Sequence, residues 1–337
     1  MWWFIARRVL WILPVLLVVT TVTFFLMYRA PGGPWDKQRR ISPTTEAALD
    51  ARFGLDKPLW FNGDALGDVR AQGEDNPLRL LQASLDSKFF KYLAGVSHGD
   101  FGPSYQSKGT ESVQSVLVRR LPATLKLGVV GITFALLVGI PLGVLGALKQ
   151  NTWIDYTSHF LATIGFAIPS FIIAVLVIVL FSSHFGIAPI RRPEEWDGIS
   201  SAYLVPGTVL GLPVMVFVTR FTRSALLEIK HQDYVRTARA KGLANQKVVS
   251  RHMLRNALLP IVTIMGPATA ELLTGSFIIE SIFGVPGIGS EFVKSIAARD
   301  YSMIMGTTLL YAFFIAVANL VVDLSYAFID PRIRTLE

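Results

Sequence analysis

Residues 127–148 read LGVVGITFALLVGIPLGVLGAL, a stretch of 22 residues without a charged side chain. A helix needs about 20 predominantly apolar residues to cross the hydrocarbon core of a bilayer. This stretch therefore predicts a membrane-spanning helix, and the fold depends on how many similar stretches accompany it.

Five further apolar stretches have a similar length. Their internal prolines predict kinks, which membrane helices tolerate because neighbouring helices satisfy the freed carbonyls. The N-terminal stretch, Val9–Tyr28, is too long for the apolar region of a signal peptide, and no Ala-x-Ala-like cleavage site follows it. We therefore expect it to be retained as a membrane span. The chain is thus predicted to be an all-α membrane protein with six transmembrane helices. The five further stretches are Val9–Tyr28, Phe160–Ser183, Gly198–Thr219, Ala257–Ile279 and Ser302–Val322.

The composition agrees with a membrane environment and excludes several kinds of chemistry. Of 337 residues, 52% are hydrophobic and only 17% are charged, against about 25% charged in soluble proteins. The chain has no cysteine, which removes disulfides, thiolate metal sites and cysteine nucleophiles. The net charge of +8 is placed between the apolar stretches, so nucleic acid is not an expected partner.

The distribution of lysine and arginine predicts the orientation. One set of short loops carries 14 basic residues and the opposite set carries four, namely Arg191, Arg192, Lys294 and Arg299. Because basic residues favour the cytoplasmic side, both termini are expected to be cytoplasmic.

The chain is expected to have three parts: an N-terminal transmembrane helix (1–29), a large extracytoplasmic segment (30–120) and a five-helix core (121–337). The middle part carries 12 basic and 11 acidic residues and contains helix-like pieces at Thr44–Phe53 and Pro77–Leu93. These features predict a small folded cap, and a disordered tether is the alternative.

The cytoplasmic loop 220–256 carries nine basic residues against Glu228 and Asp233. Asp233 is placed as the N-cap of a two-turn helix over Tyr234–Lys241, which Gly242 ends in a left-handed conformation. Asn245 is placed to cap a second helix, with Val248, Val249, His252 and Met253 on one face, that runs into the fifth span. Such an arrangement would act as a lever on that span; helices that merely lie on anionic lipid are the alternative.

The order of residues in this loop resembles the cytoplasmic coupling loop of ABC importer permeases. The similar stretches are Asp233-Tyr234-Val235-Arg236-Thr237-Ala238-Arg239-Ala240-Lys241-Gly242-Leu243 and Leu254-Arg255-Asn256-Ala257-Leu258-Leu259-Pro260. The dipeptide, oligopeptide and nickel class is the most similar, and further agreement comes from Gly99-Asp100-Phe101-Gly102, from Glu280-Ser281-Ile282-Phe283-Gly284-Val285-Pro286-Gly287-Ile288-Gly289 and from Asp330-Pro331-Arg332. Two departures are Arg236-Thr237-Ala238, where the wider superfamily has Glu-Ala-Ala, and an apparent insertion near residues 62–86.

The resemblance implies a type I ABC importer permease fold in the inner membrane, forming half of a channel for di- or oligopeptides. It implies as partners a second permease, two cytoplasmic ATPases with ATP and magnesium, an extracytoplasmic solute-binding protein and the lipid bilayer. Importers of nickel chelates or oligosaccharides belong to the same class and stay open as alternatives. The residues 233–242 listed above would contact the ATPase.

Other functions find less support in the residues. The chain has no phosphate loop, so no ATP site of that kind is expected and no cofactor or metal site is expected either. A secondary transporter usually buries several ionisable residues at midplane, whereas Glu271 is the one acid well inside a predicted span. The five histidines lack metal-ligand spacing, so an enzyme is not expected.

Three residues outside the loop are candidates for the pathway or a gate: Glu271, Glu280 and Phe283. Glu271 either faces the path or anchors a helix interface. Glu280 is expected at the membrane interface, directly after the fifth span. Ile282 and Phe283 are expected to form an apolar patch that the 30–120 cap, the second permease or the binding protein covers.

Overall fold

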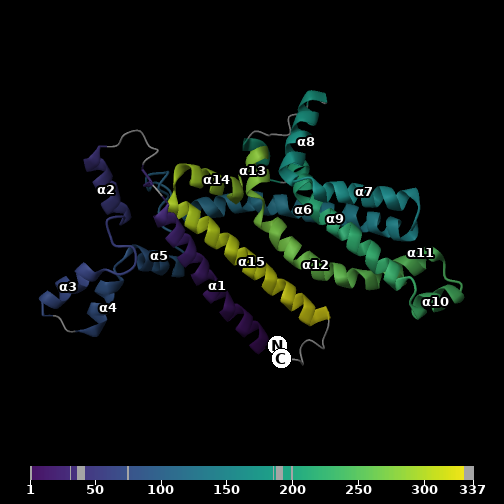
Figure 1. The fold of residues 1–337 in the computed structure, drawn as a ribbon, viewed down its shortest axis with the longest axis horizontal. Coiled ribbons are helices and arrows are strands. Elements are labelled where there is room, and N and C mark those ends of the chain that lie inside the picture. The colour runs from purple at the N-terminus through teal and green to yellow at the C-terminus, as the bar shows by residue number, and fades with distance from the viewer. Residues whose placement is uncertain are drawn as a thin grey trace. The chain divides into compact units, whose positions relative to one another are not determined.

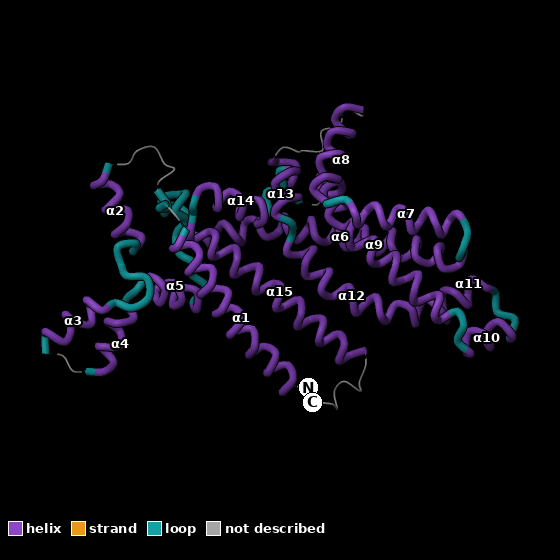
Figure 2. The backbone as a smooth tube through the Cα atoms, viewed as in Figure 1, coloured by secondary structure: helices purple, strands orange, loops and turns teal. Residues whose placement is uncertain are grey.

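The computed structural model describes residues 2–30, 32–35, 42–73, 76–184, 186, 193–198 and 200–329. Part of the predicted orientation and resemblance rests on Arg191, Arg192 and the segment 330–337, which lie outside these residues. The chain is helical (Figures 1 and 2), and within the described ranges the extended pairing is an isolated bridge between Pro103 and Ser112. The all-α prediction is therefore confirmed.

The helices follow one another in this order: α1 (Trp2–Arg29), α2 (Pro43–Phe53), α3 (Gly63–Ala71), α4 (Pro77–Leu85), α5 (Lys88–Ser97), α6 (Val113–Leu148), α7 (Trp153–Ala167), α8 (Ser170–His184), η1 (Pro193–Trp196), η2 (Ser201–Tyr203), α9 (Leu204–Ile229), α10 (Asp233–Ala240), α11 (Asn245–Lys247), η3 (Val248–Met253), α12 (Leu254–Thr274), α13 (Phe277–Phe283), α14 (Ile288–Ala298) and α15 (Tyr301–Ile329).

Four of the described helices are long and apolar enough to cross a membrane, as judged by length and composition. They contain the segments Ile5–Arg29, Val113–Leu148, Ser201–Ile229 and Tyr301–Val321. Four of the six predicted spans fall mainly within these segments, and the count of six stays a prediction.

The predicted third span, Phe160–Ser183, is not one helix. α7 ends at Ala167, Ile168 is extended with φ −90° and ψ 122°, and α8 begins after Pro169. Proline lacks an N–H and forces the preceding residue out of the helical region. The prediction of a continuous helical span is wrong, because Pro169 breaks the helix and does not only kink it.

The predicted fifth span, Ala257–Ile279, is also interrupted. α12 ends at Thr274, and Gly275 adopts φ +77°, which favours glycine. Ser276 then caps the short helix α13, its side chain accepting a hydrogen bond from the Ile279 N–H at 3.3 Å. The stretch is apolar throughout, and its composition therefore conceals the break.

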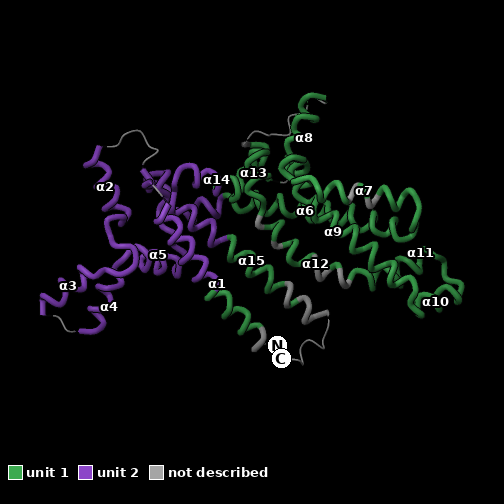
Figure 3. The backbone as a smooth tube through the Cα atoms, in the orientation of Figure 1, with its two compact units in different colours: residues 1–14, 120–291, 311–337 green, residues 15–119, 292–310 purple. Residues whose placement is uncertain are grey.

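The chain divides into two compact units (Figure 3). Unit 1 comprises 1–14, 120–291 and 311–337, and unit 2 comprises 15–119 and 292–310. In unit 1, α9 packs against α7, α8 and α12, and α13 packs against α8 and α9.

Glycines allow α6 and α9 to approach closely within unit 1. A Cβ atom on Gly211 of α9 would lie 2.4 Å from the carbonyl oxygen of Gly131 on α6. A Cβ atom on Gly143 would lie 2.6 Å from the carbonyl oxygen of Thr219. Small residues permit this backbone contact, which drives association where the hydrophobic effect between helices is weak.

Unit 2 has an aromatic core and a buried polar anchor. Trp35, Tyr105 and Tyr301 are among its buried residues. Asp300 accepts hydrogen bonds from the Ser104 hydroxyl at 2.5 Å and from the Met303 N–H at 3.1 Å, which fixes the start of α15.

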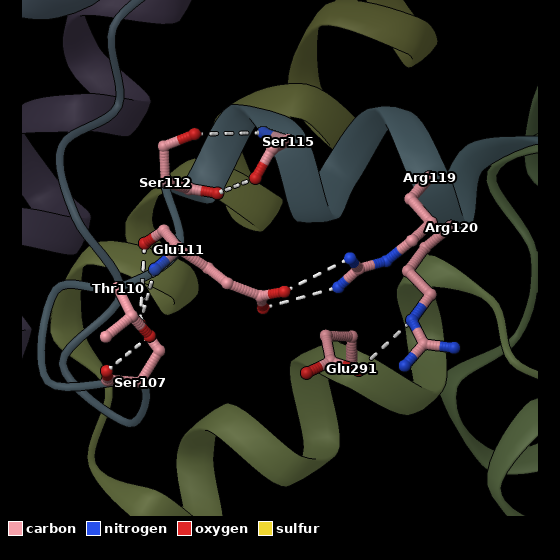
Figure 4. A network of polar contacts seen from close by, with 8 residues as sticks. All are labelled: Ser107, Thr110, Glu111, Ser112, Ser115, Arg119, Arg120 and Glu291. Atoms are coloured by element: carbon pink, nitrogen blue, oxygen red, sulfur yellow. Dashed lines mark hydrogen bonds and ion pairs between the residues drawn. The ribbon is translucent and has the colours of Figure 1, made fainter.

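The helical pieces predicted in the 30–120 segment are present in unit 2. α2 covers the first piece, and the second is divided into α4 and α5, because Ser87 begins a new helix after Asp86. Near the start of α6, Glu111 accepts two hydrogen bonds from the Arg119 guanidinium at 3.1 and 3.3 Å (Figure 4). The adjacent Arg120, in unit 1, pairs with Glu291 at 3.6 Å.

Candidate functional site

The loop after α9 forms a short helix, α10, which is exposed on one face and buried on the other. In α10, Val235 is fully buried and Ala238 nearly so, and both pack in a cluster with Leu226 of α9 and with Val248 and Met253 of η3. The other residues of the helix are exposed. The helix thus rests on the core by one apolar face and presents the remainder of its surface outward.

The exposed surface of α10 is predominantly basic. Arg236 and Arg239 are exposed on the helix and Lys241 follows it, while Asp233 lies in the first turn. Tyr234, also exposed, accepts a hydrogen bond from the Asn256 side-chain amide at 2.9 Å, which ties the helix to α12. The arrangement can contact a partner of complementary charge.

The end of α10 has the predicted geometry. Gly242 has φ +74°, and its N–H donates to the carbonyl oxygen of Arg239 at 2.9 Å. The Leu243 N–H reaches back to the carbonyl oxygen of Ala238 at 3.4 Å, as in a Schellman-type ending. The prediction of a left-handed stop at Gly242 is confirmed.

The two predicted N-caps are each displaced by one residue. Gln232 is the N-cap of α10 and Ala244 that of α11, so Asp233 and Asn245 are the first helical residues instead. At that position the Asp233 carboxylate still favours the helix start through the helix dipole.

The second part of the loop runs without interruption into α12, as predicted. α11 passes into the π-helical segment η3, in which Val248, Val249 and Met253 are buried, and α12 begins at the next residue. His252, which was expected on the same face, is half-buried. A displacement of α10 can therefore act on α12 through contacts with η3.

Glu271 lines a cavity of about 590 Å³ in unit 1. The walls include Phe166 of α7, Phe217 of α9 and Met265 of α12. The Phe166 and Phe217 rings meet edge to face with centroids 5.4 Å apart. Glu271 is exposed, and among the described lining residues it is the ionisable one.

Glu280 is fully buried and joins three segments of unit 1. Its carboxylate accepts hydrogen bonds from the Thr124 hydroxyl and from the Ser290 N–H, both at 3.0 Å. Glycines surround it closely, since a Cβ atom on Gly287 would lie 2.3 Å from one carboxylate oxygen. Burial raises the pKa of Glu280 to about 7, against the lowering effect of the Ser290 and Thr124 hydrogen bonds.

Phe283 is covered by other residues than those expected. Its ring is fully buried with Ala123 and Leu127 of α6 and with Trp196, all in unit 1. The 30–120 cap, a second permease or a binding protein is therefore not needed to cover Phe283, whereas the position of Glu280 at the membrane interface stays a prediction.

The ion pair between Asp155 and Arg223 in unit 1 was not predicted from the sequence. Asp155 of α7, only 3% exposed, accepts two hydrogen bonds from Arg223 of α9, at 2.6 and 2.7 Å. It also accepts from the Asn151 N–H at 3.0 Å. The signal in the sequence was an acidic residue, Asp155, shortly before the apolar stretch Phe160–Ser183, together with the basic loop 220–256 that contains Arg223.

These features define a helical membrane protein in which a basic surface helix, α10, is joined through η3 to the apolar helix α12. Residues 139–335 match the family described as binding-protein-dependent transport system inner membrane component. The chain belongs to this family.

Named relatives match nearly the whole length. The dipeptide transport system permease protein DppB of Bacillus subtilis is 38% identical over 95% of this chain and 94% of its own. The oligopeptide transport system permease protein OppB of Escherichia coli K12 is 36% identical over 98% and 99%. A solved structure of the inward-facing MetNI methionine ABC transporter is 21% identical, with a TM-score of 0.48, over 62% of this chain and 95% of that chain.

Proposed function

We propose that this chain is one transmembrane subunit of an ATP-driven importer, and that its cargo is a di- or oligopeptide. The peptide assignment is supported by the names of relatives that match nearly the full length. The family description supports delivery of the cargo by an extracytoplasmic binding protein. The chain is a permease component, and ATP hydrolysis is assigned to two partner ATPase subunits.

The structural observation that carries the proposal is α10. Its exposed face, from Asp233 to Lys241, bears positive charge, and its buried face contacts the helical path that leads into α12. A partner that binds α10 and changes conformation when it binds ATP can move α10 and, through η3, α12. Such a movement can switch the helices of unit 1 between two discrete arrangements. A second permease completes the channel, and the cavity beside Glu271 contributes to the path of the peptide.

Arg239→Glu tests the contact between α10 and an ATPase. The variant should insert and assemble but show peptide uptake at least tenfold below the parent, because reversed charge weakens the docking of α10. Lys247→Glu is the matched control, since Lys247 is also exposed but lies on α11. The measurements are uptake in proteoliposomes and peptide-stimulated ATP hydrolysis of the reconstituted complex; equal activity of both variants would contradict the proposal.

Gly242→Ala tests the geometry of the lever separately from its charge. A Cβ atom there meets nothing within 4 Å, so the substitution only strains a backbone at φ +74°. The cost of about 1 kcal/mol should favour another helix ending and reduce uptake more than basal ATP hydrolysis. Gly63→Ala, where a Cβ also meets nothing within 4 Å, serves as the control.

A further inference from the structure

Unit 2 contains a cavity of about 200 Å³ that the transport mechanism above does not use. Its walls come from the ends of α1 and α15, from α2 and α5, and from the segment that precedes α6. Aromatic rings form much of the lining, and three cationic side chains enter it: Arg52, Lys88 and Lys91.

The charges of the lining are unbalanced. Asp100 is its acidic member among the described residues, and one of its carboxylate oxygens already accepts a hydrogen bond from the Gly102 N–H at 2.8 Å. No carboxylate in the described ranges forms an ion pair with Lys88 or Lys91. Three cations therefore surround a space that holds one acid.

The two lysines are held at the cavity by their surroundings. The Lys88 ammonium lies 5.4 Å from the centre of the Tyr28 ring, a cation–π distance. Burial lowers the pKa of Lys88, while Asp50 and Asp56 act in the opposite direction. The Lys91 ammonium lies 3.4 Å from the place that a Cβ of Gly54 would occupy.

A hydroxyl group in the lining also lacks a partner. The Tyr92 oxygen is buried and makes no hydrogen bond in the described part of the chain. An unsatisfied buried hydroxyl is unfavourable, and a bound acceptor would satisfy it. The Tyr301 hydroxyl, by contrast, donates to the carbonyl oxygen of Gly32 at 2.8 Å.

The cavity lies where two membrane-spanning segments end. Tyr28 is next to the end of the segment Ile5–Arg29, and Tyr301 begins the segment Tyr301–Val321. Tyrosine is common at the level of lipid headgroups, where its ring and its hydroxyl meet different solvents. The predicted orientation makes this the outer leaflet.

We propose that this cavity binds a phosphate group, held by Arg52, Lys88 and Lys91 and by a hydrogen bond from Tyr92. Arginine and lysine are the usual partners of phosphate, and three cations with a free hydroxyl offer more donors than one carboxylate accepts. The phosphate is that of an outer-leaflet lipid or a free phosphate from outside the cell, and the membrane-level position favours the lipid.

The test measures how fast an amine-reactive reagent labels Lys88 and Lys91 in the purified full-length chain, by peptide mass spectrometry. The probes are inorganic phosphate and dihexanoyl phosphatidylglycerol, each against chloride at equal ionic strength, because bulk salt also screens charge. Lys108, an exposed lysine of the same unit, is the internal reference. We expect a bound phosphate group to slow labelling of Lys88 and Lys91 at least fivefold and to leave Lys108 unchanged.

The outcomes separate the two sources. Protection by the short-chain lipid alone assigns the site to a lipid headgroup, and protection by both probes shows that a free phosphate suffices. No protection by either probe, or equal protection of Lys108, overturns the proposal.

Variants give a second, independent result. Lys91→Gln and Arg52→Gln, both at the exposed rim, should each raise the phosphate or lipid concentration needed to protect Lys88 at least fivefold. Arg70→Gln removes a charge from the exposed surface of α3 and should leave that concentration unchanged. Tyr92→Phe should weaken protection without lowering thermal stability. If Lys91→Gln, Arg52→Gln and Arg70→Gln all need the same phosphate or lipid concentration to protect Lys88, the proposal is overturned.

Discussion

Glu280 is a carboxyl group whose surroundings oppose its ionisation. It has no exposed surface, and a Cβ atom on Gly275, Gly287 or Gly289 would lie 2.4, 2.3 or 3.0 Å from its carboxylate oxygens. Three hydrogen bonds, from the Thr124 hydroxyl and the N–H groups of Ser290 and Gly289, lower the pKa of the carboxyl group, yet burial is the larger effect. Glu280 therefore links α13 to α6 and α14, and its contribution to the free energy of folding depends on pH.

The first prediction concerns this pH dependence. The pKa of Glu280 rises from 4.5 in the unfolded chain to about 7 in the fold, so the folded state binds the proton more tightly. Its contribution is fully present below pH 4.5 and is lost as the pH rises through 7, by at most about 3 kcal/mol. Glu280→Gln should flatten the decline in melting temperature between pH 5 and pH 8. Glu228→Gln, on the exposed side of α9, should keep it, and a parallel decline in both variants would refute this.

A second prediction at this scale concerns Phe283. Because its ring is fully buried among residues of α6 and the 193–203 segment, truncation leaves a cavity. Phe283→Ala should lower the stability by about 3–5 kcal/mol, measured as thermal unfolding in detergent. Phe61, with 65% of its surface exposed, is the control, and Phe61→Ala should change stability by less than about 1 kcal/mol. Comparable losses in the two variants would exclude a packing role for Phe283.

At the scale of elements, the contact of α6 with α9 sets the geometry of unit 1. Gly131 and Gly211 place the two backbones against each other, and Gly128 does the same for α6 and α12, where a Cβ would lie 2.4 Å from the carbonyl oxygen of Leu272. The Asp155–Arg223 ion pair fixes α7 to α9 at one end. Backbone contacts thus fix α6 against α9 and α12, and the Asp155–Arg223 ion pair fixes α7 against α9.

Gly211→Ala tests the importance of these contacts. The added methyl would meet the Gly131 backbone, which cannot move aside as a flexible side chain can. We expect a fall in melting temperature of at least 5 °C and loss of assembly with a partner permease. Gly67→Ala, inside α3 and without neighbours within 4 Å, should be neutral or stabilising by up to about 1 kcal/mol. A neutral Gly211→Ala would show that α6 and α9 are held apart in the membrane.

The sequence predicted those elements that depend on local signals. Gly242 as a left-handed stop and the helix before it follow from residue type and order, and the structure has both. The interruptions at Pro169 and Gly275 were missed, since a proline or glycine in an apolar stretch is compatible with either a kink or a break. The burial of Phe283 and the Asp155–Arg223 pair arise from contacts between distant segments, which one sequence does not reveal.

For the whole molecule, the orientation in the membrane is the main expectation. The 14 basic residues of one set of short loops against four of the other predict that α10 lies in the cytoplasm and the 30–120 segment outside. The family is that of inner membrane components, and several described helices can span a bilayer.

Cysteine labelling gives a direct measurement of orientation, because the chain has no cysteine of its own. Single cysteines at Lys108 and at Gln246, both exposed, should react from opposite sides of the membrane with an impermeant maleimide. Lys108→Cys should react in intact cells and Gln246→Cys only after permeabilisation. Reaction of both positions from one side would reject the predicted topology.

The glycine contacts between α6 and α9 have a mechanical consequence. Side chains at an interface can change rotamer and let two helices slide, but a backbone that rests on a backbone has no such freedom. Because Gly131 meets Gly211, we expect α6 and α9 to move as one rigid body. Bending is then expected at the helix breaks at Ile168–Pro169 and Gly275. Residues at or near these two breaks, Phe166, Ser170 and Gly275, line the cavity that contains Glu271.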